Sequence, residues 1–224
     1  MDIKVLTAIE AMRLRPSMYI GDESQRSVNY LVQNVIEKLM RIGGRQFGVI
    51  LHADKFVTVK ASYVGLLPEN RRQTVKNEIG IQELLTVAHC GPTHGIDITV
   101  TNAYSEQLEV KVERDGSIWE QSHAKGIPQS PVRKTGVSQR ETTAVHFLPD
   151  KEFFVVSEFN LNELGVYLRE RAQYYEQEAS TMAATHPGKQ RALEIAEKYK
   201  SAHFVIIDER EVDSRTGTPK QIQW

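Results

Sequence analysis

Apolar residues recur at helical spacing in the first 44 residues of the chain. The pattern over residues 3–12 predicts a short helix that Pro16 ends, because a proline clashes with the preceding turn. A longer amphipathic helix is predicted over residues 28–40, closed by Gly43 and Gly44. Its apolar face consists of Val28, Leu31, Val32, Val35, Ile36, Leu39 and Met40.

Three further helices are predicted later in the chain. They cover residues 79–88, Leu161 to about Gln177, and Gln190 to Tyr199. The stretch between the last two, Thr181 to Lys189, contains Ala-Ala-Thr-His-Pro-Gly and is typical of a loop that joins two helices.

Segments rich in β-branched and aromatic residues, or with alternating apolar and polar residues, predict strands. Residues 46–52 and 56–61 form one expected hairpin, and residues 108–114 and 117–123 form another around Asp115-Gly116. Further strands are expected over residues 144–148, over residues 203–208 and in a closing segment that ends at Trp224. Helices mixed with antiparallel hairpins predict an α+β fold with helices on one face of a sheet.

The composition agrees with one domain over residues 1–224. The chain is 40% hydrophobic and 25% charged, and its 28 basic and 29 acidic residues give a net charge of −1. No global field draws such a chain to nucleic acid, so direct DNA binding is not expected. A local basic patch at Arg13, Arg15, Arg71 and Arg72 is the alternative, although acidic residues intervene and no aromatic residues interleave.

The amphipathic start carries Asp2 and Glu10, unlike a signal peptide, and no apolar run is long enough to cross a bilayer. A cytoplasmic protein without membrane contact is therefore expected. Cys90 is the only cysteine, which excludes an internal disulfide. His89, Cys90 and His94 are candidate metal ligands, but their spacing provides no evident fourth ligand, so structural roles are favoured and no metal site is expected.

Several motifs resemble the N-terminal ATPase domain of DNA gyrase B and its topoisomerase IV counterpart. They are Ile3 to Leu6, Glu10 to Arg13, Arg15 to Asp22, Val110 to Gln121, Lys125 to Pro131, Lys134 to Gly136, Val145 to Pro149 and Ile206 to Arg210. The resemblance implies the fold of the GHKL superfamily, a two-layer sandwich with a mixed, mainly antiparallel sheet. Helices on one face of that sheet hold the nucleotide in the family.

The resemblance also implies where the catalytic residues would lie, and they are replaced here. The family's general base, a glutamate on the long helix, matches Asn34, and its magnesium-binding asparagine one turn later matches Lys38. A carboxamide does not take a proton from water near neutral pH, and an ammonium group has no lone pair for a metal. The resemblance therefore implies a degenerate site that has lost hydrolysis.

The family's adenine-binding aspartate falls on Ala61 or Ser62, followed by Tyr63 and Val64 in place of a glycine and an arginine. Loss of the carboxylate removes the charged acceptor for the adenine amino group. The residual pocket positions that match the family are Gly65, Pro68, Gly95 and Thr143, and Ala61 stands among them as a substitution.

The family's lid, which closes over the triphosphate, is almost absent from the sequence. His89-Cys90-Gly91 is followed, after Pro92, by Thr93-His94-Gly95, and Asp97 stands where the family has a second glycine. A carboxylate there repels phosphate. ATP and Mg²⁺ are therefore not expected as cofactors.

Two functional hypotheses follow. The first is a non-catalytic interaction or regulatory module related to type II topoisomerases, with a topoisomerase subunit or another protein as partner. The alternative is the nucleotide-binding domain of a divergent or split type II topoisomerase, which uses ATP and Mg²⁺.

The helical segment at about 174–202 is longer than the corresponding connection in the family. It is either solvated surface or a partner-binding insertion. The chain starts two residues before the first predicted helix and ends before a transducer domain, so an arm-exchanged dimer is not expected.

Overall fold

The computed structural model describes residues 6–23, 27–62, 66–67, 79–81, 85, 98–154, 159–212 and 216–223. The helices in these ranges are α1 (Ala8–Leu14), α2 (Pro16–Ile20), α3 (Val28–Arg41), α5 (Ile98–Ala103), α6 (Leu161–Thr181) and α7 (Pro187–Ser201). The strands are β1 (Gln46–Leu51), β2 (Val57–Ser62), β3 (Leu66–Leu67), β4 (Ile79–Gly80), β5 (Ser105–Arg114), β6 (Ser117–Ala124), β7 (Ile127–Pro128), β8 (Arg133–Gly136), β9 (Thr142–Pro149), β10 (His203–Val212) and β11 (Pro219–Gln223).

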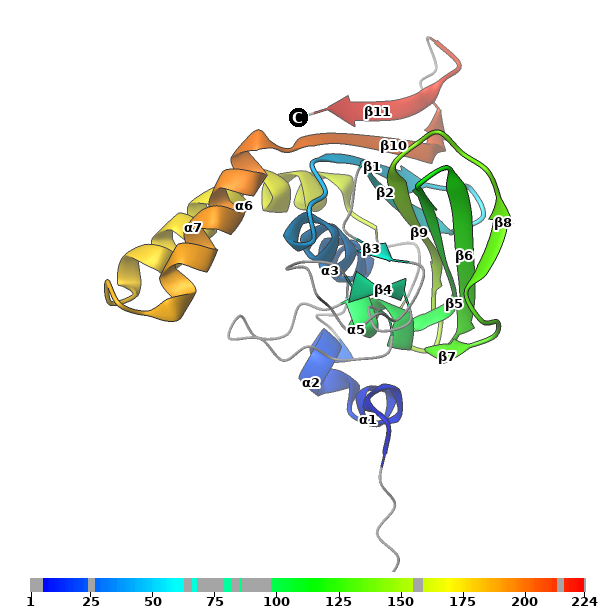
Figure 1. The fold of residues 1–224 in the computed structure, drawn as a ribbon, viewed down its shortest axis with the longest axis horizontal. Helices are drawn as coiled ribbons and strands as arrows, with labels where there is room; N and C mark the ends of the chain where they lie inside the picture. The colour runs from blue at the N-terminus through cyan, green and yellow to red at the C-terminus, as the bar shows by residue number, and fades with distance from the viewer. Residues whose placement is uncertain are drawn as a thin grey trace, which may run out of the picture.

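One large mixed sheet organises the part of the chain that the structure describes. Its order is β11-β10-β1-β2-β9-β5-β6-β7, and β8 pairs with β6. Strands β1 and β10 run parallel, whereas the other pairs are antiparallel. The helices lie on one side of this sheet, as Figure 1 shows. The predicted α+β class with helices on one face is therefore confirmed.

The two faces of the sheet differ in burial because side chains alternate along each strand. In β2, Val57, Val59 and Ala61 are buried on the inner face, and Thr58 and Lys60 are partly exposed on the outer face. Strand β9 alternates in the same way. The inner face packs on α3, whose apolar residues are almost wholly buried.

Local turn chemistry explains the accurately predicted boundaries. Helix α3 ends at Arg41, and Gly43 then adopts a φ of 116°, which a residue with a side chain rarely tolerates. Asp115 and Gly116 have φ values of 50° and 73°, the left-handed pair that a two-residue hairpin needs.

Proline explains two boundary errors. Pro16 follows the end of α1, but it also starts α2, because the missing N–H of a proline costs nothing at the first helical position. The predicted helix from Gln190 begins earlier, at Pro187, for the same reason, with His186 as its N-cap. The predicted loop therefore shortens to residues 182–186, and α6 continues to Thr181 instead of ending near Gln177.

The helix predicted over residues 79–88 was wrong at its start, since Ile79–Gly80 form the short strand β4. This strand pairs in parallel with β3, so a tertiary strand pairing overrides the local helical pattern. Ile81 and Leu85 are helical and buried in the core. The other residues of that prediction lie outside the described residues, and α5 and β8 were not assigned from the sequence.

Candidate functional site

Asn34 occupies the middle of α3 and is completely buried, with 0% of its surface exposed. Within the described part of the chain, neither its side-chain nitrogen nor its oxygen makes a hydrogen bond of good geometry. Burial raises the pKa of Tyr30, one turn earlier on α3, and a side-chain hydrogen bond of poorer geometry with Asn34 partly offsets that rise. Asn34 is thus a buried carboxamide whose polar atoms are poorly satisfied.

Lys38 lies one turn after Asn34 on α3 and is 8% exposed. The spacing of four residues places both side chains on the same side of the helix, as the sequence predicted. A lysine at this position brings a donor-only cation to the place where the resemblance implies a metal ligand.

Ala61 and Thr143 are direct neighbours across strands β2 and β9. Both are buried on the inner face, with 0% and 1% of their surfaces exposed. Ser62 pairs with Thr142 instead, and its hydroxyl accepts a hydrogen bond from the backbone N–H of Gln46 at 3.2 Å. Of the two residues that could match the adenine-binding aspartate, Ala61 is therefore the one that shares a face with Thr143.

The space next to Ala61 is filled by the turn that follows α3. A Cβ atom added at Gly44 would lie 3.2 Å from the Ala61 Cβ and 3.0 Å from the Phe47 ring. The remaining predicted site positions, Gly65, Pro68, Gly95 and Asp97, lie outside the described residues, as do His89, Cys90, His94 and the shortened lid.

Glu37, which sequence reasoning did not select, is the best-bonded polar side chain on α3. It is completely buried, and its carboxylate accepts hydrogen bonds from Arg41 at 2.9 Å, Arg171 at 3.1 Å and the Tyr167 hydroxyl at 3.0 Å. Because these donors occupy the carboxylate, Glu37 is held as an ion-pair partner rather than as a free base for water. The i, i+4 spacing of Glu37 and Arg41 was the sequence signal for part of this network.

Helix α6 supplies most of the residues that surround Glu37. Arg171 lies over the rings of Tyr167, Tyr174 and Tyr175 at 5.1, 4.3 and 4.6 Å. The Tyr175 hydroxyl accepts from Arg41 at 3.1 Å and from Arg171 at 3.2 Å. Burial, with the negative charge of Glu37, raises the pKa of Tyr167 well above its ordinary value, so its hydroxyl stays a donor. The network joins α6 to the C-terminal half of α3.

Helix α7 adds a second attachment. The Lys198 ammonium donates to the backbone carbonyls of Met40 at 3.3 Å and Arg41 at 3.2 Å, at the C-terminal end of α3. Carbonyls at a helix C-terminus lack partners inside the helix, and a cation there also interacts favourably with the helix dipole. The α6–α7 hairpin is therefore anchored to α3 at its base, and its other end projects from the body (Figure 1).

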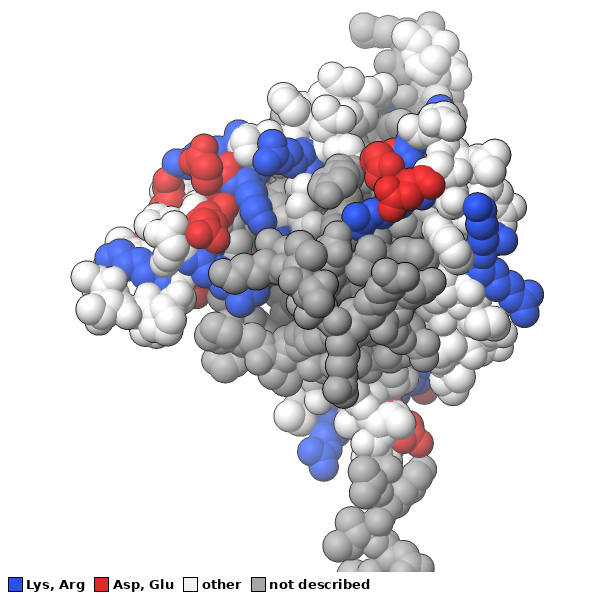
Figure 2. Space-filling view, in the orientation of Figure 1, with Lys and Arg blue, Asp and Glu red and all other residues white. Residues whose placement is uncertain are grey.

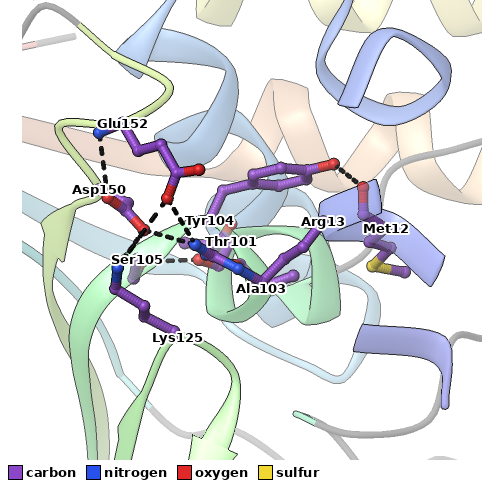
Figure 3. Close-up of polar contacts among 9 residues, drawn as sticks. All are labelled: Met12, Arg13, Thr101, Ala103, Tyr104, Ser105, Lys125, Asp150 and Glu152. Carbon is purple, nitrogen blue, oxygen red and sulfur yellow. Dashed lines mark hydrogen bonds and ion pairs between the residues drawn. The ribbon is translucent and has the colours of Figure 1, made fainter. Parts of the chain in front are cut away.

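Residues of the opening motif attach α1 to the end of α5 and to the segment that follows β9, as Figure 3 shows. The Arg13 guanidinium donates to the Ala103 carbonyl at 2.7 Å and to Asp150 at 2.9 Å. The Tyr104 hydroxyl donates to the Met12 carbonyl, and Lys125 lies 3.6 Å from Asp150. Burial alone would raise the pKa of Asp150, but hydrogen bonds from the Glu152 backbone and from Arg13 outweigh it and hold that pKa below its ordinary value. Arg13 therefore has a structural role in the described structure.

Comparison with known proteins supports the family resemblance seen in the sequence motifs. The chain is 34% identical over 212 residues to the DNA gyrase B protein of Borrelia hermsii and 32% identical over 190 residues to that of Clostridium acetobutylicum. These matches cover 86% and 76% of the chain. The chain is a gyrase-B-like domain of the GHKL type. The B subunit of DNA topoisomerase 4 from Staphylococcus aureus also resembles this gyrase-B-like domain, with 31% identity over 207 residues and 84% of the chain covered.

The gyrase-B-like domain spans about a third of the length of these relatives, from 29% to 33%. No protein-family model matches it. In the described ranges, no three His, Cys, Asp or Glu side chains cluster in a way that could hold a metal ion. Helices long and apolar enough for a bilayer are likewise not found in those ranges.

Proposed function

We propose that this gyrase-B-like domain has lost ATP hydrolysis and ATP binding, and acts in the cytoplasm as a non-catalytic interaction or regulatory module related to type II topoisomerases. Asn34 is the observation that carries the proposal. By the family resemblance it matches the general base, and it is fully buried on a well-packed α3. A carboxamide takes no proton from water near neutral pH. The neighbouring carboxylate, Glu37, is committed to two arginines and a tyrosine.

Lys38 and Ala61 support the same conclusion independently. A lysine offers no lone pair to Mg²⁺, and an alanine offers no acceptor to the adenine amino group. Loss of one principal catalytic group alone typically lowers turnover by several orders of magnitude. By the resemblance, the three substitutions affect the general-base, metal-binding and adenine-recognition positions.

Measurement of phosphate release from Mg·ATP tests the loss of hydrolysis. We expect no turnover above background for the natural chain, and none for Asn34→Glu, because the metal and adenine positions remain substituted. Turnover restored by Asn34→Glu alone would overturn this account. An intact far-ultraviolet circular dichroism spectrum of the variant shows that the comparison concerns folded protein.

The α6–α7 hairpin is our proposed partner-binding element, in keeping with an insertion at about 174–202. It projects from the body on a base that is hydrogen-bonded to α3, and basic and acidic side chains are interspersed over it in Figure 2. Val166 and Leu193 are both 42% exposed on its two helices. An amphipathic helix pair with exposed aliphatic residues is suited to packing against another protein.

Co-purification from the source cell tests the partner proposal. We expect a type II topoisomerase subunit to be recovered with the natural chain and to be lost when Val166 and Leu193 are both replaced by serine. Leu14→Ser is the matched control, because Leu14 is 66% exposed on α1, outside the hairpin. Equal recovery with the hairpin variant would exclude the hairpin as the contact.

The alternative, a nucleotide-binding domain of a divergent or split type II topoisomerase, rests on Thr143. This residue keeps its family identity and lies buried beside Ala61. A threonine in a strand is also an ordinary strand residue. Saturable nucleotide binding by the purified chain would favour this alternative.

A further inference from the structure

A chain of hydrogen bonds crosses the outer face of the sheet, away from α3 and the nucleotide-site positions. It joins β10, β2, β9 and the residue that follows β1, and these strands are consecutive in the sheet. Glu209 lies 2.9 Å from His52 Nδ1, His52 Nε2 lies 2.8 Å from the Thr58 hydroxyl, and that hydroxyl lies 2.8 Å from His146 Nδ1.

The end group sets the direction of this chain when both imidazoles are uncharged. An ionised Glu209 only accepts, so His52 Nδ1 carries the donated proton. With both imidazoles uncharged, His52 Nε2 accepts from Thr58, and the Thr58 oxygen accepts from His146 Nδ1. The proton of His146 then sits on Nδ1, and Nε2 presents a lone pair. Burial lowers the pKa of His146, which favours the uncharged form at neutral pH.

His146 also lines an open pocket of about 500 Å³ on the same face, together with Phe56 and Glu109. The rings of His146 and Phe56 stack with centroids 4.5 Å apart. Glu109 is the direct register partner of His146 on β5, so the two side chains project side by side. A carboxylate, an imidazole acceptor and a flat aromatic wall therefore meet in one pocket.

No salt bridge joins Glu109 to another side chain among the described residues. The adjacent Lys111 lies 3.6 Å from Glu113 instead. Partial burial and the charge of Glu120 raise the pKa of Glu109, against the opposing effect of Lys111. A cation bound in the pocket would stabilise the negative charge of the Glu109 carboxylate.

We propose that this pocket binds a guanidinium group, either of a small molecule or of an arginine side chain. A guanidinium is planar and carries several N–H donors in a fixed fork, so it donates to Glu109 and to His146 Nε2 together while it packs against an aromatic wall. A lysine ammonium is more strongly hydrated and lacks the flat shape. The nearby polar side chains Gln107, Ser122 and Gln129 complete the rim.

Titration of ¹⁵N-labelled protein with Nα-acetyl-arginine methylamide tests this proposal. We expect saturable shifts of the backbone amides of Glu109 and His146, and at least about tenfold weaker binding after Glu109→Gln, because the charged acceptor is lost. Glu106→Gln is the matched control, since Glu106 lies on β5 but does not line the pocket. His146→Phe, which keeps an aromatic ring and removes the acceptor, is expected to weaken binding as well.

Separate titrations with free arginine and with a short arginine-containing peptide distinguish a metabolite from a protein side chain as the source of the group. Saturation by either supports the pocket. The proposal is overturned if neither saturates, if Nα-acetyl-lysine methylamide binds equally well, or if Glu109→Gln leaves the affinity unchanged. Because the pocket lies on the opposite face from Asn34, these results do not depend on the nucleotide site.

Discussion

Two buried asparagines on α3 differ in how well their side-chain amides are hydrogen-bonded. Asn29 is 1% exposed and donates to the Asn160 carbonyl at 2.9 Å and to Glu163 at 3.1 Å, and its oxygen accepts from the Asn160 amide at 3.3 Å. Asn34 is equally buried, but hydrogen bonds of good geometry are not found for it within the described residues. A buried side-chain amide without hydrogen bonds of good geometry lowers the free energy of unfolding.

Asn34→Leu is therefore expected to raise the free energy of unfolding by about 1 kcal/mol, because an apolar side chain of the same branched shape removes the desolvation cost. Urea denaturation followed by circular dichroism measures the change. Asn29→Leu is the control on the same helix and is expected to lower stability by about 2 kcal/mol, since it abandons bonded partners. A lower stability for Asn34→Leu, similar to that of Asn29→Leu, would show that Asn34 has a polar partner.

At the scale of elements, the structure depends on polar contacts between α3 and the α6–α7 hairpin. Glu37 receives two arginines and a tyrosine, while Lys198 caps the C-terminal end of α3. The arginines in this network expose only 13% of their side chains, so each depends on the carboxylate for compensation.

Glu37→Gln is expected to lower the free energy of unfolding by about 3 kcal/mol, because it leaves two largely buried guanidinium groups without their counter-charge. Thermal and urea unfolding would both report the loss. Glu176→Gln, which removes an exposed ion pair with Lys200 on the same hairpin, should cause no measurable change. Equal stability of the two variants would show that the buried network contributes little.

The sequence predicted these elements more accurately than their contacts. The apolar period of α3, the Asp115-Gly116 turn and the alternation of β5 and β6 depend on local rules, and each was found close to its predicted bounds. The start of the predicted helix at Ile79 failed because strand pairing between β3 and β4 is non-local. The contacts of Glu37 with Arg171 and of Arg13 with Asp150 join residues more than 130 positions apart, which spacing cannot reveal.

At the scale of the whole molecule, several buried titratable side chains have shifted pKa values, so the stability of the fold depends on pH. His123 is 2% exposed, has no hydrogen bond to either ring nitrogen in the described part of the chain, and burial lowers its pKa to about 4. Asp150 and Asp208 have pKa values below the ordinary range, despite burial, because hydrogen bonds from Arg13 and Arg210 help to stabilise the charged forms.

These pKa values predict a falling stability as the pH decreases from about 6.5 to 4. In that window the unfolded chain takes up a proton at His123 that the folded chain does not, which lowers the free energy of unfolding by about 3 kcal/mol. The two aspartates add a further loss only below their ordinary pKa of 3.8, as they become protonated. Unfolding free energies measured across pH should show the first decline in the natural chain and a smaller decline in His123→Leu, in which His146, whose pKa burial also lowers, still contributes. A full decline retained in His123→Leu would assign it to other groups.

Calorimetric titration of the purified chain with ATP and Mg²⁺ tests the central claim most directly, that a gyrase-type frame remains around a nucleotide site that no longer functions. The ATPase domain of a gyrase B relative provides the positive control. Because we propose that Asn34, Lys38 and Ala61 replace the general base, the metal ligand and the adenine acceptor, we predict no saturable heat up to about 1 mM nucleotide, equivalent to binding weaker than about 4 kcal/mol. Saturable binding in the micromolar range would contradict the account.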